Sequence, residues 1–369
     1  MKIGLLGFGV VGRGVYEIAA SREDMQVRKV LCLEDISLSD AEAVKDFAEI
    51  LNDNDIDTVV EAMGGLHPSH EFAVAALKAG KNYVTSNKAL VCTYYDELVP
   101  LAEQMGVKLR CTAAVGGGIG WLSELERSRR AQTIEQVGGI MNGTCNYILD
   151  HMTRLGMDYA QALKQAQSLG YAEANPATDV EGIDTWHKLI LSANVAFGVS
   201  FDKESIPVAG IAGITAEDVA NFAAHGLVCK LMSKARRTDG GFDAYVQPTL
   251  VPQGSPEAAV PLNYNLITFL GKTSERMSFY GQGAGRYPTA YNVVEDLIDV
   301  AAGKGFYAPY GPVTKAGNAQ TMRYYVRGGW TEPAEEVWGS AVITAPVSVA
   351  RMHAWRKANP QAFIAGVEA

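Results

Sequence analysis

Residues 1–12 read MKIGLLGFGVVG, in which a short apolar run is followed by three glycines in the spacing G-x-G-x-x-G. The run Lys2–Leu6 predicts a buried strand, and a helix is expected from about Val10 to Ala20. Between such a strand and helix, the first glycine permits a tight turn, the second lets the backbone approach a pyrophosphate, and the third allows close helix–strand packing. The helix N-terminus then offers unpaired N–H groups to the anion. The sequence therefore predicts a dinucleotide-binding loop made of Gly7, Phe8, Gly9, Val10, Val11 and Gly12.

The alternation of strands and helices continues as far as residue 112. Strands are expected at 27–33, 57–61, 82–85 and 107–112, with helices at 67–80 and 98–104. A polar segment, 34–46, leads into a further helix that ends near Leu51. Strands that alternate with helices at this spacing form parallel βαβ units. The predicted fold class is therefore α/β, with a Rossmann-type doubly wound parallel sheet in the first domain.

The character of the sequence changes after the glycine run Gly116–Gly118. Longer strands and helices predict a second, α+β domain with a mixed sheet. Its expected strands are 132–141, 229–236, 243–250, 266–271 and 277–280, and its expected helices are 144–154, 158–169 and 182–197. An amphipathic helix near 288–302 is expected to return to the first domain. The predicted domains are 1–125 completed by a return helix at 286–310, then 126–285, and a C-terminal tail, 311–369, without a complete regulatory module.

Composition and charge argue against several classes of protein. The net charge is −9 and no basic stripe is present, so a nucleic-acid binder is not expected. The five cysteines are widely spaced and form no CxxC pair, which argues against a disulfide framework and a zinc site. No run of 18 apolar residues occurs, so no membrane span is expected. With no targeting segment expected and free thiols typical of a reducing compartment, the predicted location is the cytoplasm.

Two carboxylates follow the second predicted strand, where the adenosine ribose of a bound dinucleotide lies. Glu34 and Asp35 come 22 and 23 residues after Gly12. A carboxylate there accepts hydrogen bonds from ribose hydroxyls but repels the 2′-phosphate of NADP. Lys45, the next basic residue, is placed in the following helix, which leaves Arg13 as the one nearby cation that could favour NADP. The sequence thus predicts NAD as the preferred cofactor over NADP; the alternative is that both carboxylates are solvated loop residues.

Charged residues gather in the stretch 166–188, AQSLGYAEANPATDVEGIDTWHK. Glu181, Asp184 and Lys188 are three and four residues apart and would share one face of a helix. Because the following residues are too apolar to be exposed, the charges suit the mouth of a cleft better than the alternative, a surface salt bridge. Hydride addition to an aldehyde develops negative charge on oxygen, which an ammonium can stabilise and protonate. Lys88, just past a parallel strand, would face the cofactor cleft, the alternative being an exposed loop cation.

The same stretch carries a family resemblance. The pattern Ala166-x3-Gly170-Tyr171-Ala172-x2-Asn175-Pro176-x2-Asp179-Val180-x-Gly182-x-Asp184-x3-Lys188 resembles the signature of homoserine dehydrogenases. Supporting segments are SNKALV at 86–91, AVGGGI at 114–119, GIMNGTCNYIL at 139–149 and GQGAGRYPTA at 281–290. The resemblance spans about residues 1–310. It implies the NAD(P)-dependent interconversion of L-homoserine and L-aspartate 4-semialdehyde, a reaction of threonine and methionine biosynthesis.

The resemblance also implies roles for individual residues. Lys188 and Lys88 correspond to catalytic residues, with Lys188 favoured as the proton donor. The implied substrate-binding residues are Tyr171, Glu173, Asp179, Asp184, Asn142, Gly143 and Thr144. The implied cofactor site adds Gly64, Ser86, Asn87, Gly285 and Thr289 to the glycine loop, Glu34 and Asp35. Members of this family are typically homodimers through the sheet of the second domain.

A monovalent cation such as Na⁺ is a further feature that the resemblance implies, with the backbone carbonyls of Val115, Gly117 and Ile119 as candidate ligands. The sequence departs from the family pattern here, because Thr112 stands where a glutamate is usual and Gly120 where a proline is usual. It departs again after Gly317, where the remaining residues are too few for the βαββαβ regulatory module of many bacterial members. Residues 322–327, MRYYVR, are expected to form the first strand of a remnant of that module.

Two other interpretations remain open at this point. The first is another two-domain amino-acid or semialdehyde dehydrogenase. An aspartate-semialdehyde dehydrogenase, for example, would need a nucleophilic cysteine with a base; Cys145 has no evident histidine partner and is interpreted as a buried thiol. A catalytically silent NAD-binding sensor would keep the glycine loop but has no reason to keep Lys88, Asp184 and Lys188 together. A change in nicotinamide absorbance with homoserine discriminates between an enzyme and a sensor.

Overall fold

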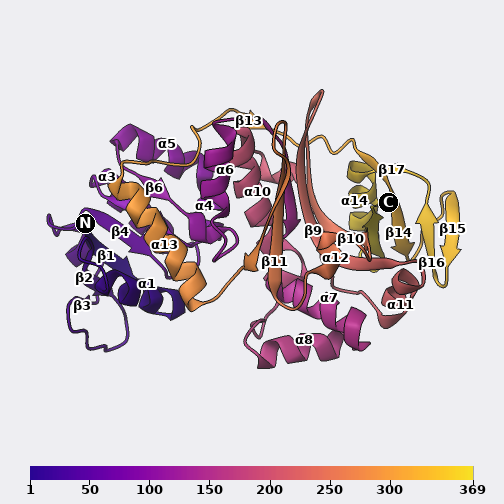
Figure 1. The fold of residues 1–369 in the computed structure, drawn as a ribbon, viewed down its shortest axis with the longest axis horizontal. Helices are drawn as coiled ribbons and strands as arrows, with labels where there is room; N and C mark the ends of the chain where they lie inside the picture. The colour runs from indigo at the N-terminus through magenta and orange to yellow at the C-terminus, as the bar shows by residue number, and fades with distance from the viewer. Residues whose placement is uncertain (369) are drawn as a thin grey trace. The chain divides into compact units, whose positions relative to one another are not determined.

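The structure is a computed structural model that describes residues 1–368, and it divides into two compact units. Unit 1 comprises Met1–Ala131, Asn194–Ser200 and Gln282–Pro312, and unit 2 comprises the rest of the described chain. The chain therefore leaves unit 1 and returns to it twice, as the colours in Figure 1 allow the reader to follow.

Unit 1 is built on a six-stranded sheet with the order β3-β2-β1-β4-β5-β6. The strands are β1 Lys2–Leu6, β2 Gln26–Leu31, β3 Glu42–Val44, β4 Thr58–Glu61, β5 Asn82–Thr85 and β6 Leu109–Arg110. All neighbouring strands are parallel, and the chain order reverses between β1 and β4. Ligands of doubly wound sheets bind at the carboxyl ends of the strands beside such a reversal. This sheet confirms the predicted Rossmann-type fold class.

Seven helices belong to the segments of unit 1 as described. They are α1 Val10–Ala20, α2 Ala48–Leu51, α3 Ser69–Lys78, α4 Lys88–Thr93, α5 Tyr95–Met105, α6 Trp121–Arg129 and α13 Arg286–Ala301. Val15 and Ala19 of α1 share one hydrophobic core with Val293 and Leu297 of α13. Figure 1 shows α13, in orange, beside the indigo helix α1. A helix from late in the sequence thus completes the packing around the first strands.

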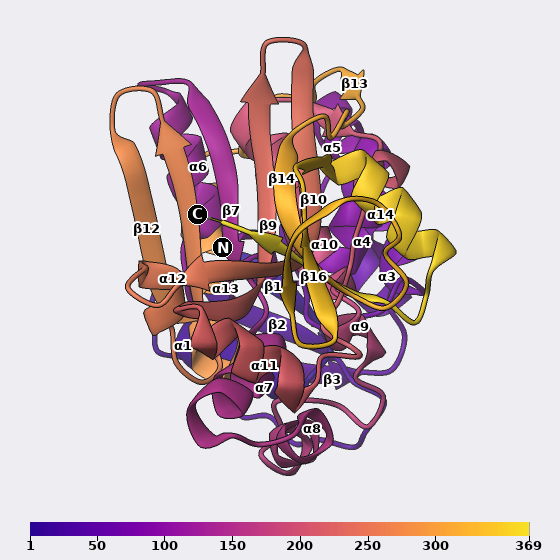
Figure 2. The same ribbon diagram turned by 90° about the vertical axis from the view of Figure 1, so that its right-hand side faces the viewer.

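Unit 2 contains a mixed sheet with the order β12-β11-β7-β9-β10-β18-β14-β16-β15. Its strands are β7 Ile134–Ile140, β9 Leu227–Thr238, β10 Gly241–Pro252, β11 Tyr264–Gly271, β12 Glu275–Gln282, β14 Thr321–Arg327, β15 Ala334–Trp338, β16 Ala341–Thr344 and β18 Phe363–Val367. The β9–β10 hairpin is antiparallel and long, whereas β18 runs parallel to β10. Figure 2 shows this hairpin together with the yellow C-terminal strands β14 and β16. Short strand β17, Val347–Ser348, pairs with β14, and β8, Ser200–Phe201, pairs with β13, Val313–Thr314.

The other helices are α7 Gly143–Leu155, α8 Tyr159–Ser168, α9 Ala177–Val180, α10 Ile183–Phe197, α11 Ala216–Ala224, α12 Pro256–Ala259 and α14 Val349–Ala358. Helix α7 begins at an N-cap, Asn142, whose side chain accepts a hydrogen bond from the N–H of Cys145. Helix α10 begins after Gly182, whose φ of +85° separates it from α9. These two helix starts position the charged residues of the 166–188 stretch.

Several local predictions are wrong. Lys45 does not lie in a helix, because the three-residue strand β3 precedes it and α2 begins only at Ala48. Glu181 does not share the face of Asp184 and Lys188, because it ends α9 and lies outside α10. Helices α6 and α11 were not predicted. The strand expected at 322–327 is confirmed as β14, although it joins the sheet of unit 2. Along residues 1–368, no helix combines the length and apolar character needed to cross a membrane.

Candidate active site

The glycine loop lies between β1 and α1. Gly7 has a φ of +91°, and a Cβ on Gly12 would lie 2.1 Å from the carbonyl oxygen of Gly7, so both positions require glycine. A Cβ on Gly9 would meet no described atom within 4 Å, which leaves the backbone there open to a ligand. Gly9 is also the N-cap of α1, and no described side chain caps that helix. The first N–H groups of α1 are therefore available to an anion, as a pyrophosphate site requires.

A cavity of about 970 Å³ opens beside this loop within unit 1. Its lining includes Gly7–Val10, the residues Cys32–Glu34 that follow β2, and Phe72 of α3. Its volume is that of a cofactor site rather than a packing defect. The glycine cradle, the uncapped helix and the cavity together fit the dinucleotide that the sequence predicts.

Lys45 lines this cavity beside the residues that follow β2, outside the helix in which the sequence placed it. Its Nζ donates to the carbonyl oxygens of Leu33 and Glu34, at 2.8 and 2.6 Å. The same Nζ lies 3.0 Å from Oδ1 of Asp35. Asp35 and Lys45 therefore form a solvent-exposed ion pair, which is weak because water screens it. Glu34 is exposed and lines the cavity.

Two other cations line the cavity, and both have partners inside unit 1. The Nε of Arg13 donates to the carbonyl oxygen of Phe8 at 3.0 Å, and its guanidinium lies 4.8 Å from the centre of the Phe8 ring. Arg286, the first residue of α13, pairs with Glu17 of α1. The preceding residue, Gly285, has a φ of +126°, and its carbonyl oxygen accepts from the N–H of Thr289. The predicted residues Gly285 and Thr289 thus form the first turn of α13 beside a cavity residue.

Glu61 organises the loops after β4 and β5, and sequence reasoning did not single it out. It is fully buried, and its Oε1 accepts from the N–H groups of Met63 and Gly64 at 2.7 and 2.9 Å. Its Oε2 accepts from the hydroxyl of Thr85, whose Oγ1 in turn accepts from the N–H of Asn87. One carboxylate thereby holds both loops in place. The sequence feature that could have indicated this role is the position of Glu61, a carboxylate at the end of a buried strand.

The predicted residues Ser86, Asn87 and Lys88 lie at the start of α4. Asn87 is the N-cap of this helix, because its Oδ1 accepts from the N–H of Leu90, and its Nδ2 donates to the carbonyl oxygen of Gly65 at 2.6 Å. Lys88 is the first residue of α4 and is partly exposed. These residues therefore follow the carboxyl end of β5, on the strand edge where a doubly wound sheet binds its ligands.

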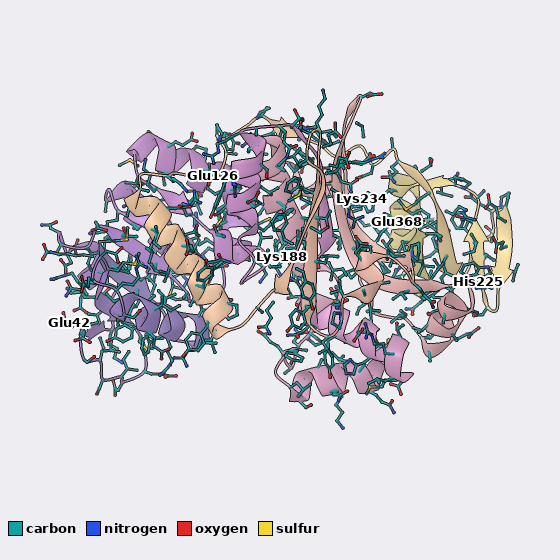
Figure 3. All side chains as sticks on the ribbon, in the orientation of Figure 1. Glu42, Glu126, Lys188, His225, Lys234 and Glu368 are labelled. Carbon is teal, nitrogen blue, oxygen red and sulfur yellow. The ribbon has the colours of Figure 1, made fainter. Side chains whose placement is uncertain are left out.

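Unit 2 holds a separate cluster of predicted site residues, around the start of α7. The Nδ2 of Asn142 donates to Asp179 at 2.7 Å and to Asp184 at 2.8 Å. The Nζ of Lys188 donates to the carbonyl oxygen of Met141 at 2.7 Å and to Oδ2 of Asp184 at 2.8 Å. Figure 3 labels Lys188 among the side chains of unit 2. One amide and one ammonium thus converge on the same carboxylate.

This cluster is almost completely removed from water. Asn142 and Asp184 are each 4% exposed and Lys188 is 7% exposed. Burial, and then the neighbouring carboxylate of Asp184, raise the pKa of Asp179. A charged pair in such surroundings is costly unless its groups are matched, so its presence points to a function rather than to stability.

The remaining predicted substrate residues lie at the start of α7 and on the segment that leads from α8 to α9. The hydroxyl of Thr144 donates to the carbonyl oxygen of Tyr171 at 2.6 Å, which ties α7 to this segment. The carbonyl oxygen of Glu173 accepts from Gln167 at 3.0 Å, while Glu173 itself is exposed. A Cβ on Gly143 would lie 2.5 Å from the carbonyl oxygen of Asn263, so only glycine fits there. Thr144 thus links Tyr171 to the cluster, whereas Glu173 lies on the solvent side.

Cys145 lies beside the cluster without the properties of a nucleophile. It is completely buried, and its Sγ donates to the carbonyl oxygen of Asp179 at 3.1 Å. Burial raises the pKa of this thiol well above its ordinary value, and the carboxylates of Asp179 and Asp184 raise it further. A thiolate is therefore disfavoured here. The geometry supports the interpretation of Cys145 as a buried thiol.

The candidate cation ligands Val115, Gly117 and Ile119 lie in unit 1, between a 3-10 turn at Thr112–Ala114 and helix α6. All three residues are buried. Residues 1–368 contain no group of three or more histidine, cysteine or acidic side chains placed to hold a metal ion. Any cation in this loop would therefore depend on its carbonyl oxygens.

Comparisons with known proteins cover the glycine loop of unit 1 and the charged cluster of unit 2. Residues 7–112 match the family described as homoserine dehydrogenase, NAD binding domain, and residues 121–298 match the family described as homoserine dehydrogenase. The homoserine dehydrogenase of Bacillus subtilis is 36% identical over 314 residues, which cover 81% of this chain and 72% of that protein. That of Corynebacterium glutamicum is 38% identical over 320 residues, which cover 82% and 72%.

The fold agrees with these sequence matches. The crystal structure of a homoserine dehydrogenase from Thiobacillus denitrificans superimposes with a TM-score of 0.87 at 29% identity, covering 100% of this chain and 98% of that one. The matched residues include the glycine loop of unit 1 and the cluster of Asn142, Asp184 and Lys188 in unit 2. The chain therefore belongs to the homoserine dehydrogenase family, whose members are oxidoreductases with an NAD-binding domain.

Proposed function

We propose that this protein interconverts L-homoserine and L-aspartate 4-semialdehyde with a nicotinamide cofactor. The observation that carries the proposal is the buried cluster in which Lys188 and Asn142 both donate to Asp184. In this proposal residues 1–125 and 286–310 bind the cofactor, and residues 126–285 bind the substrate. A silent sensor is disfavoured because it gains nothing from a buried ion pair of this kind.

The reduction direction needs a hydride at the aldehyde carbon and a proton at the oxygen, which yields the alcohol. NAD(P)H supplies the hydride when bound. Lys188 has three N–H donors, of which two are engaged by Met141 and Asp184. The third can donate to the substrate oxygen as negative charge develops there, and then deliver the proton. Asp184 keeps the Lys188 side chain oriented through this step.

The other predicted residues have roles that follow from charge. Homoserine carries an ammonium group, for which the carboxylates of Asp179, Asp184 and Glu173 are suitable partners. Lys88 supplies a second cation at the strand edge that carries the cofactor loops. Under this proposal Lys88 acts with Lys188 on the reacting oxygen.

We favour NAD over NADP as the cofactor. The exposed ion pair between Lys45 and Asp35 reduces, without removing, the repulsion of a 2′-phosphate by Asp35. Glu34 still presents a carboxylate to the cavity, and the cations Arg13, Lys45 and Arg286 each have a partner within unit 1. A 2′-phosphate would have to compete for these cations and tolerate Glu34, whereas a ribose hydroxyl can donate to Glu34 directly.

A homodimer and a cytoplasmic location complete the proposal. Edge strand β12 and its neighbour β11 expose Leu270 and Tyr280 by 37 and 54%, and strand alternation puts both side chains on the face that carries Tyr264. Tyr264 stacks on Tyr280 across these strands. A face of this kind is suited to a second copy of the chain. The five free cysteines suit a reducing compartment.

The deciding experiment is a steady-state assay of the purified protein. With homoserine supplied, absorbance at the nicotinamide band should rise with NAD, and more slowly with NADP. Aspartate 4-semialdehyde with NADH should give the reverse change. No change with either cofactor would overturn the proposal in favour of a silent cofactor-binding protein.

A further inference from the structure

The loop between Thr112 and α6 contains the three backbone carbonyls that the family resemblance implies as ligands of a monovalent cation. Within unit 1, the loop packs against the segment that precedes α13. The N–H of Gly118 donates to the carbonyl oxygen of Gln282 at 3.1 Å, and a Cβ on Gly117 would lie 2.5 Å from the carbonyl oxygen of Gly283. Gly117 also has a φ of +50°. The loop is therefore in backbone contact with the residues that lead into α13.

Two of the three candidate carbonyl oxygens already accept hydrogen bonds. The Nδ2 of Asn292, a residue of α13, donates to the carbonyl oxygen of Gly117 at 2.6 Å. The N–H of Trp121 donates to the carbonyl oxygen of Ile119 at 2.7 Å. Asn292 is only 2% exposed, so its hydrogen bond is made away from water. A cation on these carbonyls would have to share them with the positive ends of two N–H dipoles.

The residue at the start of the loop provides no negative charge. The hydroxyl of Thr112 lies within hydrogen-bond distance of Asp296, Ser123 and Tyr307, at 2.6, 2.9 and 2.9 Å. Asp296 is itself engaged by the guanidinium of Arg110 at 3.1 Å. The carboxylate of Asp296 is thus already paired with Arg110, and Thr112 has no carboxylate that could bind a cation. The donor set of this loop does not fit a bound monovalent ion.

We propose that the amide of Asn292 takes the place of the cation in this chain. A cation on backbone carbonyls would hold the loop by attraction to their oxygens. Asn292 also holds the loop, because its Nδ2 donates to the carbonyl oxygen of Gly117 from α13, a helix that packs on α1. The loop, the segment before α13 and α13 itself are then fixed by neutral hydrogen bonds. The order of this part of unit 1 should not depend on Na⁺ or K⁺.

The first test is thermal unfolding of the unaltered protein in sodium, potassium or tetramethylammonium chloride at equal ionic strength. Tetramethylammonium is too large and too apolar at its surface to bind carbonyl oxygens. The melting temperature should agree among the three salts within about 1 °C. A saturable rise with sodium or potassium would show a specific ion site and overturn the proposal, whatever the enzymatic activity.

The second test changes Asn292 itself. Asn292→Ala leaves the buried carbonyl of Gly117 without its donor, and should lower the melting temperature by roughly 2–6 °C in every salt. A fall in melting temperature of less than about 1 °C would show that the Asn292 amide does not stabilise the loop, and would overturn the proposal. The matched control is Asn52→Asp, at an exposed position, which should melt within about 1 °C of the unaltered protein in every salt.

A third variant asks whether Asn292 stands at the position of the ion. Asn292→Asp replaces the N–H donor with a carboxylate that faces a carbonyl oxygen, and a cation would relieve that repulsion. This variant should melt higher in sodium or potassium than in tetramethylammonium, which Asn52→Asp should not. Equal melting of Asn292→Asp in all three salts would contradict the proposed replacement. Should this variant not fold, the first two tests still decide the matter.

Discussion

The Nζ of Lys188 lies 2.8 Å from Oδ2 of Asp184, one turn earlier on the same helix, and both side chains are buried. The spacing of four residues brings the two charges together without help from the rest of the fold. What the fold adds is the carbonyl oxygen of Met141 and the amide of Asn142, which fix the directions of the remaining hydrogen bonds. The pair is thereby held in one orientation, as the proposed proton transfer requires.

Replacing Lys188 should therefore affect chemistry far more than cofactor binding. Lys188→Ala should lower kcat by roughly 10²–10⁴, the usual contribution of a general acid. Cofactor affinity, measured by fluorescence titration of NADH, should stay near normal, because the glycine loop belongs to unit 1. Lys164→Ala, at an exposed position on α8, serves as the control. Retention of most of the activity by Lys188→Ala would remove this residue from the catalytic role.

The two carboxylates assigned to the substrate should behave differently. Asp184→Ala leaves Lys188 and Asn142 without their shared acceptor, so both kcat and the affinity for homoserine should fall. Glu173 is exposed and makes no such contact, so Glu173→Ala should mainly raise KM. Glu181→Ala is the matched control, because Glu181 is exposed and lies outside α10. Unchanged saturation by homoserine in Glu173→Ala would show that its carboxylate does not bind substrate.

Cofactor choice should follow the charge of residue 34. We expect kcat/KM for NAD to exceed that for NADP by roughly ten- to hundredfold, as one unfavourable charge contact of about 1.5–3 kcal/mol would give. Glu34→Gln should narrow this ratio by improving the use of NADP. Lys45→Ala should widen the ratio of the two kcat/KM values, because Asp35 would lose the ammonium with which it pairs. A native preference for NADP would mean that Lys45 and Arg13 outweigh Glu34 in the cavity.

Threonine should inhibit this protein weakly at most. Residues 321–367 supply strands to the sheet of unit 2, with β14 between β18 and β16, and are thereby committed to the core of that unit. We therefore expect millimolar threonine to act only as a competitor of homoserine, with linear double-reciprocal plots. Cooperative inhibition at low threonine would imply that this segment also forms an effector site.

Local spacing was enough to predict part of this structure. The glycine loop and the pairing of Asp184 with Lys188 depend on residues less than two helical turns apart, and both were predicted from the sequence. Lys45 was misplaced because a three-residue strand, β3, carries too little hydrophobic pattern to be recognised. Its partners Leu33 and Glu34 then could not be foreseen.

The return of a late helix to the first domain could be predicted, but its side-chain partners there could not. Arg110 is completely buried among Asp296, Asp299 and Glu126, two of which arrive on the return helix α13. Asn292 reaches the carbonyl oxygen of Gly117 from the same helix. In one sequence, a polar residue inside an amphipathic helix does not reveal its partner. Only the packing of α13 on unit 1 brings these groups together.

The position of β18 has a consequence for the biogenesis of the protein. This strand is made long after β10, yet it lies between β10 and β14, and Lys234 of β9 pairs with Glu368 beside it at 3.1 Å (Figure 3). Until β18 leaves the ribosome, β10 presents an unpaired edge that strands of other nascent chains can join. Closing so long a loop is slow, so β10 stays open to such pairing for longer than a hairpin edge would. The nascent chain should thus depend on chaperones that shield strand edges. The yield of folded protein should fall when nascent chains are made faster than these chaperones can bind them.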